Sequence, residues 1–133
     1  MLTVEIKAMD GGAGHARFLV LFRNRGAVTC TLQGYPSVRG IRDGRVVVTA
    51  RHTKSGYFTT KPGGALVVLK EGEYASVVLE AYLGANSQMG PCPKFDNWSI
   101  APRSDAKHQL SKAPPDMCYP EVHRLSKGDA SQP

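Results

Sequence analysis

The sequence contains no long hydrophobic run, and its glycines, cysteines and histidines occur in none of the spacings that mark common cofactor sites. The longest apolar stretches, such as residues 18–22, are of strand length and fall short of the roughly 20 residues that a transmembrane helix needs. No secretory signal precedes the first strand-like residues, so we expect either a cytosolic protein or a mature chain whose signal peptide was removed. No glycine-rich loop precedes a helical pattern, which argues against a phosphate-binding loop.

Catalytic and metal-binding motifs are also missing. The three cysteines show no Cys-x-x-Cys spacing, the four histidines form no His-x-His or His-x-x-x-His pair, and no serine lies in a Gly-x-Ser-x-Gly elbow. We therefore expect no enzyme, no cofactor and no resident metal ion. The alternative is a copper carrier or a hydrolase whose site is assembled from scattered histidine, methionine and cysteine residues, since soft sulfur ligands suit copper(I). The candidates for it are His15, His52, His108, His123, Met89, Met117 and Cys118.

The default interpretation of these polar residues is structural. The four histidines lie in different elements and are expected to be ordinary surface residues. Glu71, Glu73 and Glu80 flank or lie on one predicted strand, and we interpret them as a solvated edge rather than as paired catalytic carboxylates.

The patterning predicts an all-β protein. At 133 residues, with 41% hydrophobic and 21% charged residues, the chain is of the size and composition of one soluble domain. Apolar residues alternate with polar ones from Leu2 to Ala8, residues 16–23 are apolar on both faces as in a central strand, and turn residues recur about every ten positions. We expect an immunoglobulin-like antiparallel β-sandwich of seven to nine strands with little or no helix, formed by residues 1–124 and followed by a flexible tail, 125–133.

The net charge of +6 is concentrated in one segment. Between Arg39 and Lys61 six basic residues face a single acidic residue, Asp43, so this segment alone carries +5. Such a surface raises the local concentration of anionic partners, although solvated side chains on exposed strands explain the charge equally simply. The candidate ligand-binding residues are Arg39, Arg42, Arg45, Arg51, Lys54 and Tyr57.

The cysteines indicate an oxidising compartment, because cysteines in proline-flanked loops of a small all-β chain favour disulfides. This compartment also argues against a nucleic-acid partner. In an immunoglobulin-like layout the turn after residue 23 and the loop at 84–93 lie at the same end of the sandwich, which favours a Cys30–Cys92 disulfide. The rival pairing is Cys92–Cys118, and either arrangement leaves one cysteine unpaired.

Several of these segments resemble a family of actinobacterial secreted proteins and lipoproteins whose domain has no assigned function. The pattern is Asn24-Arg25-Gly26, then Cys-Thr-Leu-x-Gly-Tyr-Pro-x-Val from Cys30 to Val38, with further matching strands out to residue 124. The chain departs from the family at Glu71, where proline is usual, and it lacks the family's cysteine ahead of the first strand. That missing cysteine would be the natural partner of an orphan Cys118.

The resemblance implies an extracytoplasmic, cell-envelope location, either secreted or lipid-anchored, and supplies no catalytic residues. We therefore expect a non-enzymatic envelope domain that binds a protein, a glycan or an anionic envelope ligand through its basic face. We expect a monomer that meets the membrane only through a lipid anchor that this chain has lost.

Overall fold

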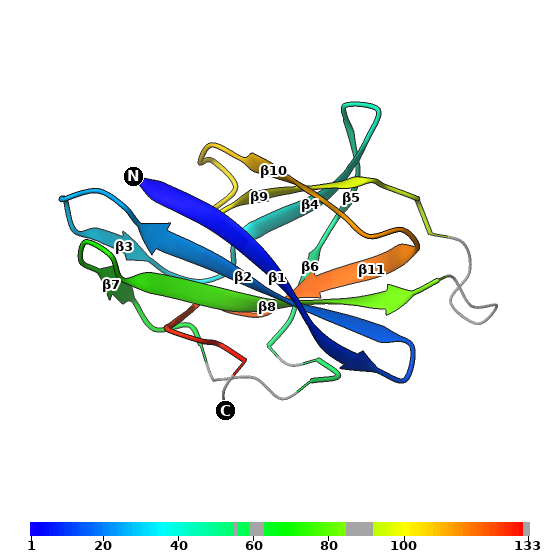
Figure 1. Ribbon diagram of the computed structural model, residues 1–133, viewed down its shortest axis with the longest axis horizontal. Coiled ribbons are helices and arrows are strands. Elements are labelled where there is room, and N and C mark those ends of the chain that lie inside the picture. The colour runs from blue at the N-terminus through cyan, green and yellow to red at the C-terminus, as the bar shows by residue number, and fades with distance from the viewer. Residues whose placement is uncertain (55, 59–62, 85–91, 132–133) are drawn as a thin grey trace.

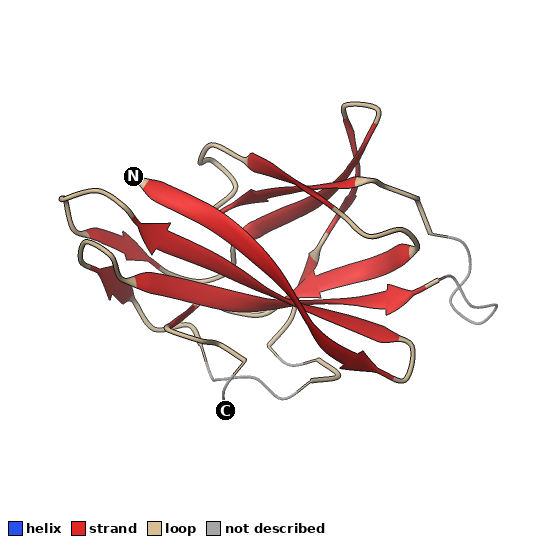
Figure 2. Ribbon diagram, viewed as in Figure 1, coloured by secondary structure: helices blue, strands red, loops and turns tan. Residues whose placement is uncertain are grey.

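The computed structural model describes residues 1–54, 56–58, 63–84 and 92–131. Across these residues every regular element is a β-strand and none is a helix (Figure 2). No helix in the described part of the chain could span a membrane.

The larger sheet has six strands, of which two form its centre (Figure 1). Its order is β1-β2-β8-β11-β6, and β12 pairs with β8 beyond the end of β11. All its pairs are antiparallel except β11–β6, which is parallel. The strands are β1 (Leu2–Gly12), β2 (His15–Asn24), β6 (Arg51–His52), β8 (Tyr74–Leu83), β11 (Met117–Val122) and β12 (Ser126–Lys127).

The smaller sheet has four strands in the order β10-β9-β4-β5, all antiparallel. Asp43 and Gly44 both have positive φ, which gives the tight turn between β4 and β5 the twist that antiparallel strands require. A separate two-stranded ribbon, β3–β7, lies at the end of the sandwich where β8 begins (Figure 1). The strands are β3 (Cys30–Leu32), β4 (Ser37–Arg42), β5 (Arg45–Thr49), β7 (Val67–Leu69), β9 (Asn97–Ala101) and β10 (Gln109–Lys112).

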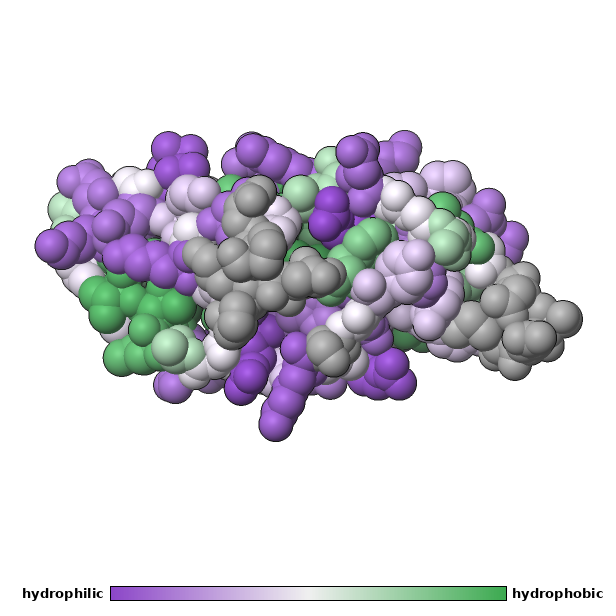
Figure 3. Space-filling model, turned by 90° about the horizontal axis from the view of Figure 1, so that it is seen from below, coloured by the Kyte–Doolittle hydropathy of each residue, from purple (hydrophilic) through white to green (hydrophobic). Residues whose placement is uncertain are grey.

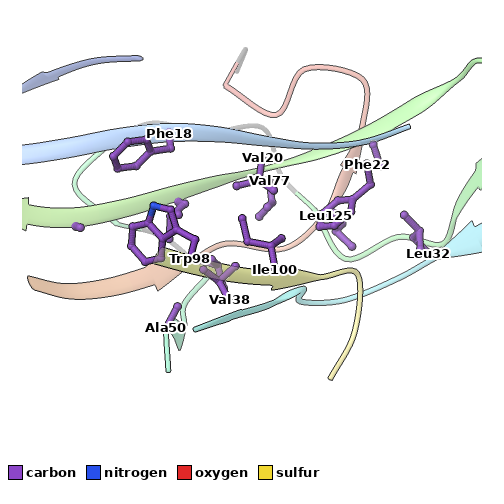
Figure 4. Packing of buried hydrophobic residues seen from close by; sticks show 14 of the residues in the cluster. Phe18, Val20, Phe22, Leu32, Val38, Ala50, Val77, Trp98, Ile100 and Leu125 are labelled. Carbon is purple, nitrogen blue, oxygen red and sulfur yellow. The ribbon is translucent and has the colours of Figure 1, made fainter. Parts of the chain in front are cut away.

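The core lies between the two sheets. Phe18 and Val20 of β2 and Val77 of β8 face Trp98 and Ile100 of β9 across the interior (Figure 4). The Trp98 side chain is fully buried and meets the Phe18 ring edge-on, with the ring centroids 6.1 Å apart. This contact joins the two layers at the centre of the domain, where burial of apolar area contributes most to stability.

The outer face of the central strands is also apolar, and the C-terminal segment covers part of it. Leu19, Leu21 and Val78 form a second buried cluster that includes Ala130. The backbone N–H of Ala130 donates to Ser76 Oγ at 2.7 Å, and β12 pairs with β8. Residues with apolar side chains on both faces, as predicted for 16–23, need this second layer.

The expected fold class is confirmed: the chain is an all-β sandwich. The described residues form twelve strands where seven to nine were expected, because four of these strands have only two or three residues. The expected flexible tail is wrong for residues 125–131, because Leu125 and Ala130 are buried and β12 is part of the sheet. The folded domain therefore extends beyond 124, and residues 132–133 lie outside the described part.

Candidate functional site

The basic residues predicted to bind ligand separate into three places. Arg42 and Arg45 lie at the exposed tip of the β4–β5 hairpin, and Lys54 is exposed in the loop after β6. Arg39 and Arg51 instead line two clefts on either side of Thr49, whose side chain borders both. Lys61 lies outside the described residues, so the predicted basic face is described only as far as Lys54.

The cleft that contains Arg39 has a volume of about 400 Å³, and we call it the cationic cleft. Arg103 contributes a second guanidinium, although its Nε is paired with Asp105 at 2.7 Å. Within the described residues, no carboxylate lies within ion-pair distance of Arg39. The complete lining is Tyr35, Pro36, Ser37, Arg39, Val46, Thr49, His52, Arg103 and Ser104. The cleft thus combines one uncompensated positive charge with several hydroxyl groups.

Two aromatic rings border this cleft in a fixed arrangement. The Tyr35 and His52 rings are stacked, with centroids 4.5 Å apart and planes within 3° of parallel. They hold the Gly-Tyr-Pro corner after β3 against β6. Tyr35 is half-buried and His52 is exposed, and both residues line the cleft.

The pKa of His108 depends on the charge in the cationic cleft. Its Nδ1 donates to the Ala106 carbonyl at 3.1 Å, and its Nε2 lies 2.9 Å from Ser37 Oγ, which acts as the donor to a neutral ring. Burial and the nearby positive charge of Arg39 lower the pKa of His108, outweighing the opposite effect of the Ala106 carbonyl. His108 is therefore neutral at pH 7, and an anion beside Arg39 would raise its pKa.

The second cleft has a volume of about 370 Å³, and we call it the tyrosine cleft. It is lined by Tyr82, Tyr119, Pro120, Arg51, Val48 and Thr49. Tyr119 has a φ of 51° in a bulge that shifts the register of β11 against β8. Strained backbone of this kind is retained where the surroundings fix it, and it is frequent at binding sites.

A buried acid–histidine pair lies beside the tyrosine cleft. Glu80 of β8 and His123, the residue after β11, are 2% and 3% exposed. His123 Nε2 and Glu80 Oε2 are in direct hydrogen-bond contact. Glu80 Oε1 accepts from the backbone N–H groups of Tyr57 at 2.9 Å and Phe58 at 3.3 Å. The buried carboxylate is thus fully hydrogen-bonded, as burial of a charge requires.

The environment of His123 favours its charged form. Burial alone lowers the pKa of this ring. The hydrogen bond and charge of Glu80, the hydrogen bond to the Thr53 carbonyl and the charge of Glu121 together outweigh burial and raise the pKa of His123 above its ordinary value of 6.5. The pair is therefore an imidazolium–carboxylate ion pair over more of the neutral range than a free histidine would allow.

Glu121 of β11 completes a group of three metal-ligating side chains. One ligand atom each from Glu80, Glu121 and His123 lie within 4.8 Å of one another, and we call this group the acid–histidine cluster. A small void of about 20 Å³ adjoins it, lined by His15, Tyr57, Glu80, Ala81, Tyr82, Tyr119 and Glu121. The predicted residue Tyr57 lies here, its ring stacked on His15 at 3.9 Å, and not in the cationic cleft.

The sequence interpretation of two of these residues was wrong. Glu80 was expected on a solvated edge and His123 on the surface, yet both are buried. A signal for Glu80 was present, because it is the single charged residue between Ala75 and Ala81, a run of which one face is wholly apolar. No such signal marks His123 or Glu121, which become neighbours of Glu80 only through the pairing of β8 with β11.

The predicted Cys30–Cys92 disulfide is also wrong. The disulfide joins Cys92 to Cys118, whose Cα atoms are 5.7 Å apart, and Cys30 is a free, half-buried cysteine. Arg23 pairs with Tyr74 at the start of β8, whereas Cys118 pairs with Tyr82 near its end. The turn after β2 and Cys118 therefore lie at opposite ends of β8, and the rival pairing is the correct one. The disulfide takes Cys118 away from the alternative copper site, and Met89 lies outside the described residues.

An apolar surface patch lies far from both clefts. Val28, Leu66 and Val68 are among the exposed large hydrophobic residues, with 80%, 58% and 42% of their surface exposed. Figure 3 shows apolar surface gathered at the end of the molecule where the β3–β7 ribbon lies, beside an otherwise largely polar face. This end is chemically distinct from the cationic cleft.

Comparisons with known proteins identify the family and not an activity. No curated protein and no solved structure matches the chain. A family model described as a domain of unknown function, DUF4232, matches residues 1–128, which include all three members of the acid–histidine cluster and both clefts. The chain therefore belongs to the DUF4232 family of domains.

Proposed function

We propose that this domain is a non-catalytic binding module of the actinobacterial cell envelope, and that its ligand is an anionic glycan held in the cationic cleft. The observation that carries the proposal is the uncompensated guanidinium of Arg39 inside a cleft lined by hydroxyl groups. An arginine side chain matches a carboxylate or phosphate group with two parallel hydrogen bonds. The hydroxyls of Ser37, Thr49 and Ser104 suit the hydroxyl groups of a sugar.

The dimensions of the clefts support a polymeric ligand. Each has the volume of a small-molecule site, and Thr49 borders both. A chain lying across Thr49 would reach from Arg39 to Arg51 and pass the tyrosine rings of the second cleft. Arg51 contributes less charge than Arg39, because Glu121 Oε2 lies 3.0 Å from its Nη2.

An extracytoplasmic location is part of the proposal. The Cys92–Cys118 disulfide supports it, because disulfides persist in oxidising compartments. The size of the void beside the acid–histidine cluster supports the absence of catalysis, because this cluster is the strongest candidate for a catalytic group among the described residues. The void beside that cluster has room for a water molecule but not for an organic substrate.

The test uses polygalacturonate, a polymer of uronic acid, with neutral dextran as the uncharged comparison. We expect the wild-type protein to bind polygalacturonate, with affinity falling as salt screens the charges, and not to bind dextran. Arg39→Gln should weaken binding about tenfold or more, since a hydrogen bond to a charged group contributes about 1.5–3 kcal/mol. Arg45→Gln is the matched control, because it removes the same charge from the hairpin tip.

An NMR titration of His108 gives a second reading at the same place. Saturating polygalacturonate should raise the pKa of His108, because the bound carboxylate offsets the charge of Arg39. Equal losses of affinity in Arg39→Gln and Arg45→Gln would show a diffuse basic face instead of a site. Absence of binding, or equal binding of dextran, would refute the proposal.

A further inference from the structure

The side chains of Glu80 and His123 each have two polar atoms. One atom of each is held by the backbone, and the second atom of each is directed toward the other side chain. Glu80 Oε1 is held by the backbone N–H groups of Tyr57 and Phe58, so Oε2 is the oxygen that faces His123. His123 Nδ1 lies 3.3 Å from the Thr53 carbonyl oxygen, which can only accept, and 3.2 Å from Thr53 Oγ1, which can donate or accept. We assign Nδ1 as the donor to the carbonyl, with the hydroxyl directed elsewhere. Nε2 is then directed at Glu80 Oε2. Metal-binding histidines are oriented in this way, by a backbone carbonyl on the second ring nitrogen.

Glu121 is held in the same manner from the other side. Its Oε2 is bound to Arg51 Nη2 at 3.0 Å, which leaves Oε1 available. Gly56 leaves space between the two carboxylates, because a Cβ at this position would collide with Glu80 Oε2 and with Glu121 Oε1. Two carboxylate oxygens therefore flank a position that the absence of a side chain keeps open.

With Nδ1 as the donor, the contact between His123 and Glu80 favours a cation. A neutral His123 would direct the lone pair of Nε2 at the carboxylate of Glu80, which is repulsive in a buried site. A proton on Nε2 satisfies the pair. A divalent ion between them removes the repulsion as well, and it can also be coordinated by Oε1 of Glu121. One imidazole and two carboxylates form a ligand set that Zn²⁺ accepts.

We propose that the acid–histidine cluster is a binding site for one divalent transition-metal ion, with Zn²⁺ as its probe. Glu80, Glu121 and His123 supply one ligand atom each, and these atoms lie within 4.8 Å of one another. The void of about 20 Å³ beside them has room for a water molecule as the fourth ligand. Three protein ligands with one open position is a known zinc geometry. This inference is independent of the proposed glycan binding.

Binding of the metal ion replaces the proton on Nε2 of His123. The ion takes the Nε2 lone pair of His123, and the proton that Nε2 carried leaves to solvent, so each ion bound to the protonated form releases one proton. Zinc affinity should accordingly rise with pH as this proton is lost. The charged and titratable groups around the site are Glu80, Glu121, Arg51, His15, Arg17, Tyr57, Tyr82 and Tyr119.

The bound ion would also tie three separate parts of the chain together. Glu80 comes from β8 and Glu121 from β11, and the residues after β6 are attached through the contacts of Tyr57 with Glu80 and of Thr53 with His123. A ligand that binds only the folded state raises its stability in proportion to the logarithm of its concentration. Zinc should therefore raise the melting temperature of the protein.

The experiment measures Zn²⁺ binding to chelator-stripped protein by competition with a chromophoric chelator, and proton release in buffers of different ionisation enthalpy. We expect one equivalent of Zn²⁺ with proton release. Glu121→Gln should weaken binding about tenfold or more and still fold, because it leaves the Glu80–His123 pair intact. Gly56→Ala should weaken binding as well, because it fills the open position while all three ligands remain.

Two control variants keep the test decisive. His52→Gln and Cys30→Ser each remove a metal-ligating side chain outside the acid–histidine cluster, and both should bind Zn²⁺ as the wild type does. The inference is overturned by the absence of a stoichiometric site in wild-type protein, by Glu121→Gln binding as tightly as wild type, or by an equal loss in either control. Failure of polygalacturonate binding would leave this result unaffected.

Discussion

Replacing Cys92 by serine removes the bridge to Cys118 without creating a cavity in the core, because Cys92 is only half-buried. The two cysteines are 26 positions apart in the sequence. In the chain-entropy treatment, closing a loop of this length in the unfolded state stabilises the folded state by about 3.5 kcal/mol. For a domain of this size the melting temperature should fall by roughly 10 °C.

The assay is urea unfolding followed by the fluorescence of the buried Trp98, performed in oxidising buffer and again with reductant. We expect Cys92→Ser in either buffer to match the reduced wild-type protein, and the oxidised wild type to be more stable. Cys30→Ser is the matched control, because it removes the free cysteine from the β3–β7 ribbon and should leave stability nearly unchanged.

The opposite pattern would refute the reasoning. If Cys30→Ser lowered the free energy of unfolding by as much as Cys92→Ser, or if peptide mapping without reductant recovered Cys30 in a bridge, the described pairing would be wrong. Equal stability of oxidised and reduced wild-type protein would show that the bridge contributes nothing.

Two further predictions concern the buried histidine and a buried glycine. Because folding raises the pKa of His123, its contribution to stability is fully present below pH 6.5 and is lost as pH rises through the raised value, so urea unfolding at pH 6 and pH 9 should show a fall that His123→Gln abolishes. Folding lowers the pKa of His108, so this residue contributes to the pH dependence with the opposite sign. If the difference in stability between pH 6 and pH 9 is the same in His123→Gln as in the wild type, the linkage is contradicted. Gly40→Ala should cost about 1–3 kcal/mol, because the new Cβ would lie 2.6 Å from an aromatic ring, and Gly12→Ala, which has open space, should cost far less. Equal losses in both glycine variants would contradict this packing argument.

The fold class followed from local patterns. The alternation from Leu2 to Ala8 predicted β1, and the Asp43-Gly44 dipeptide predicted the β4–β5 hairpin. Apolar side chains on both faces of residues 16–23 predicted the central place of β2. These features depend on the period of the strand and on the backbone preferences of single residues, which any window of sequence contains.

Other features depended on which strands are neighbours, and only the tertiary structure decided them. A period of two assigns Glu80 to one face of β8 but says nothing of what lies beside that face. The pairing of β8 with β11, more than 30 residues further along, brings the half-buried Glu121 and the buried His123 to it, although Glu80 and His123 were both expected to be exposed. The same pairing places Cys118 at the end of β8, and so chooses its disulfide partner. Burial and charge are properties of such neighbours, and for this reason composition and spacing could not predict them.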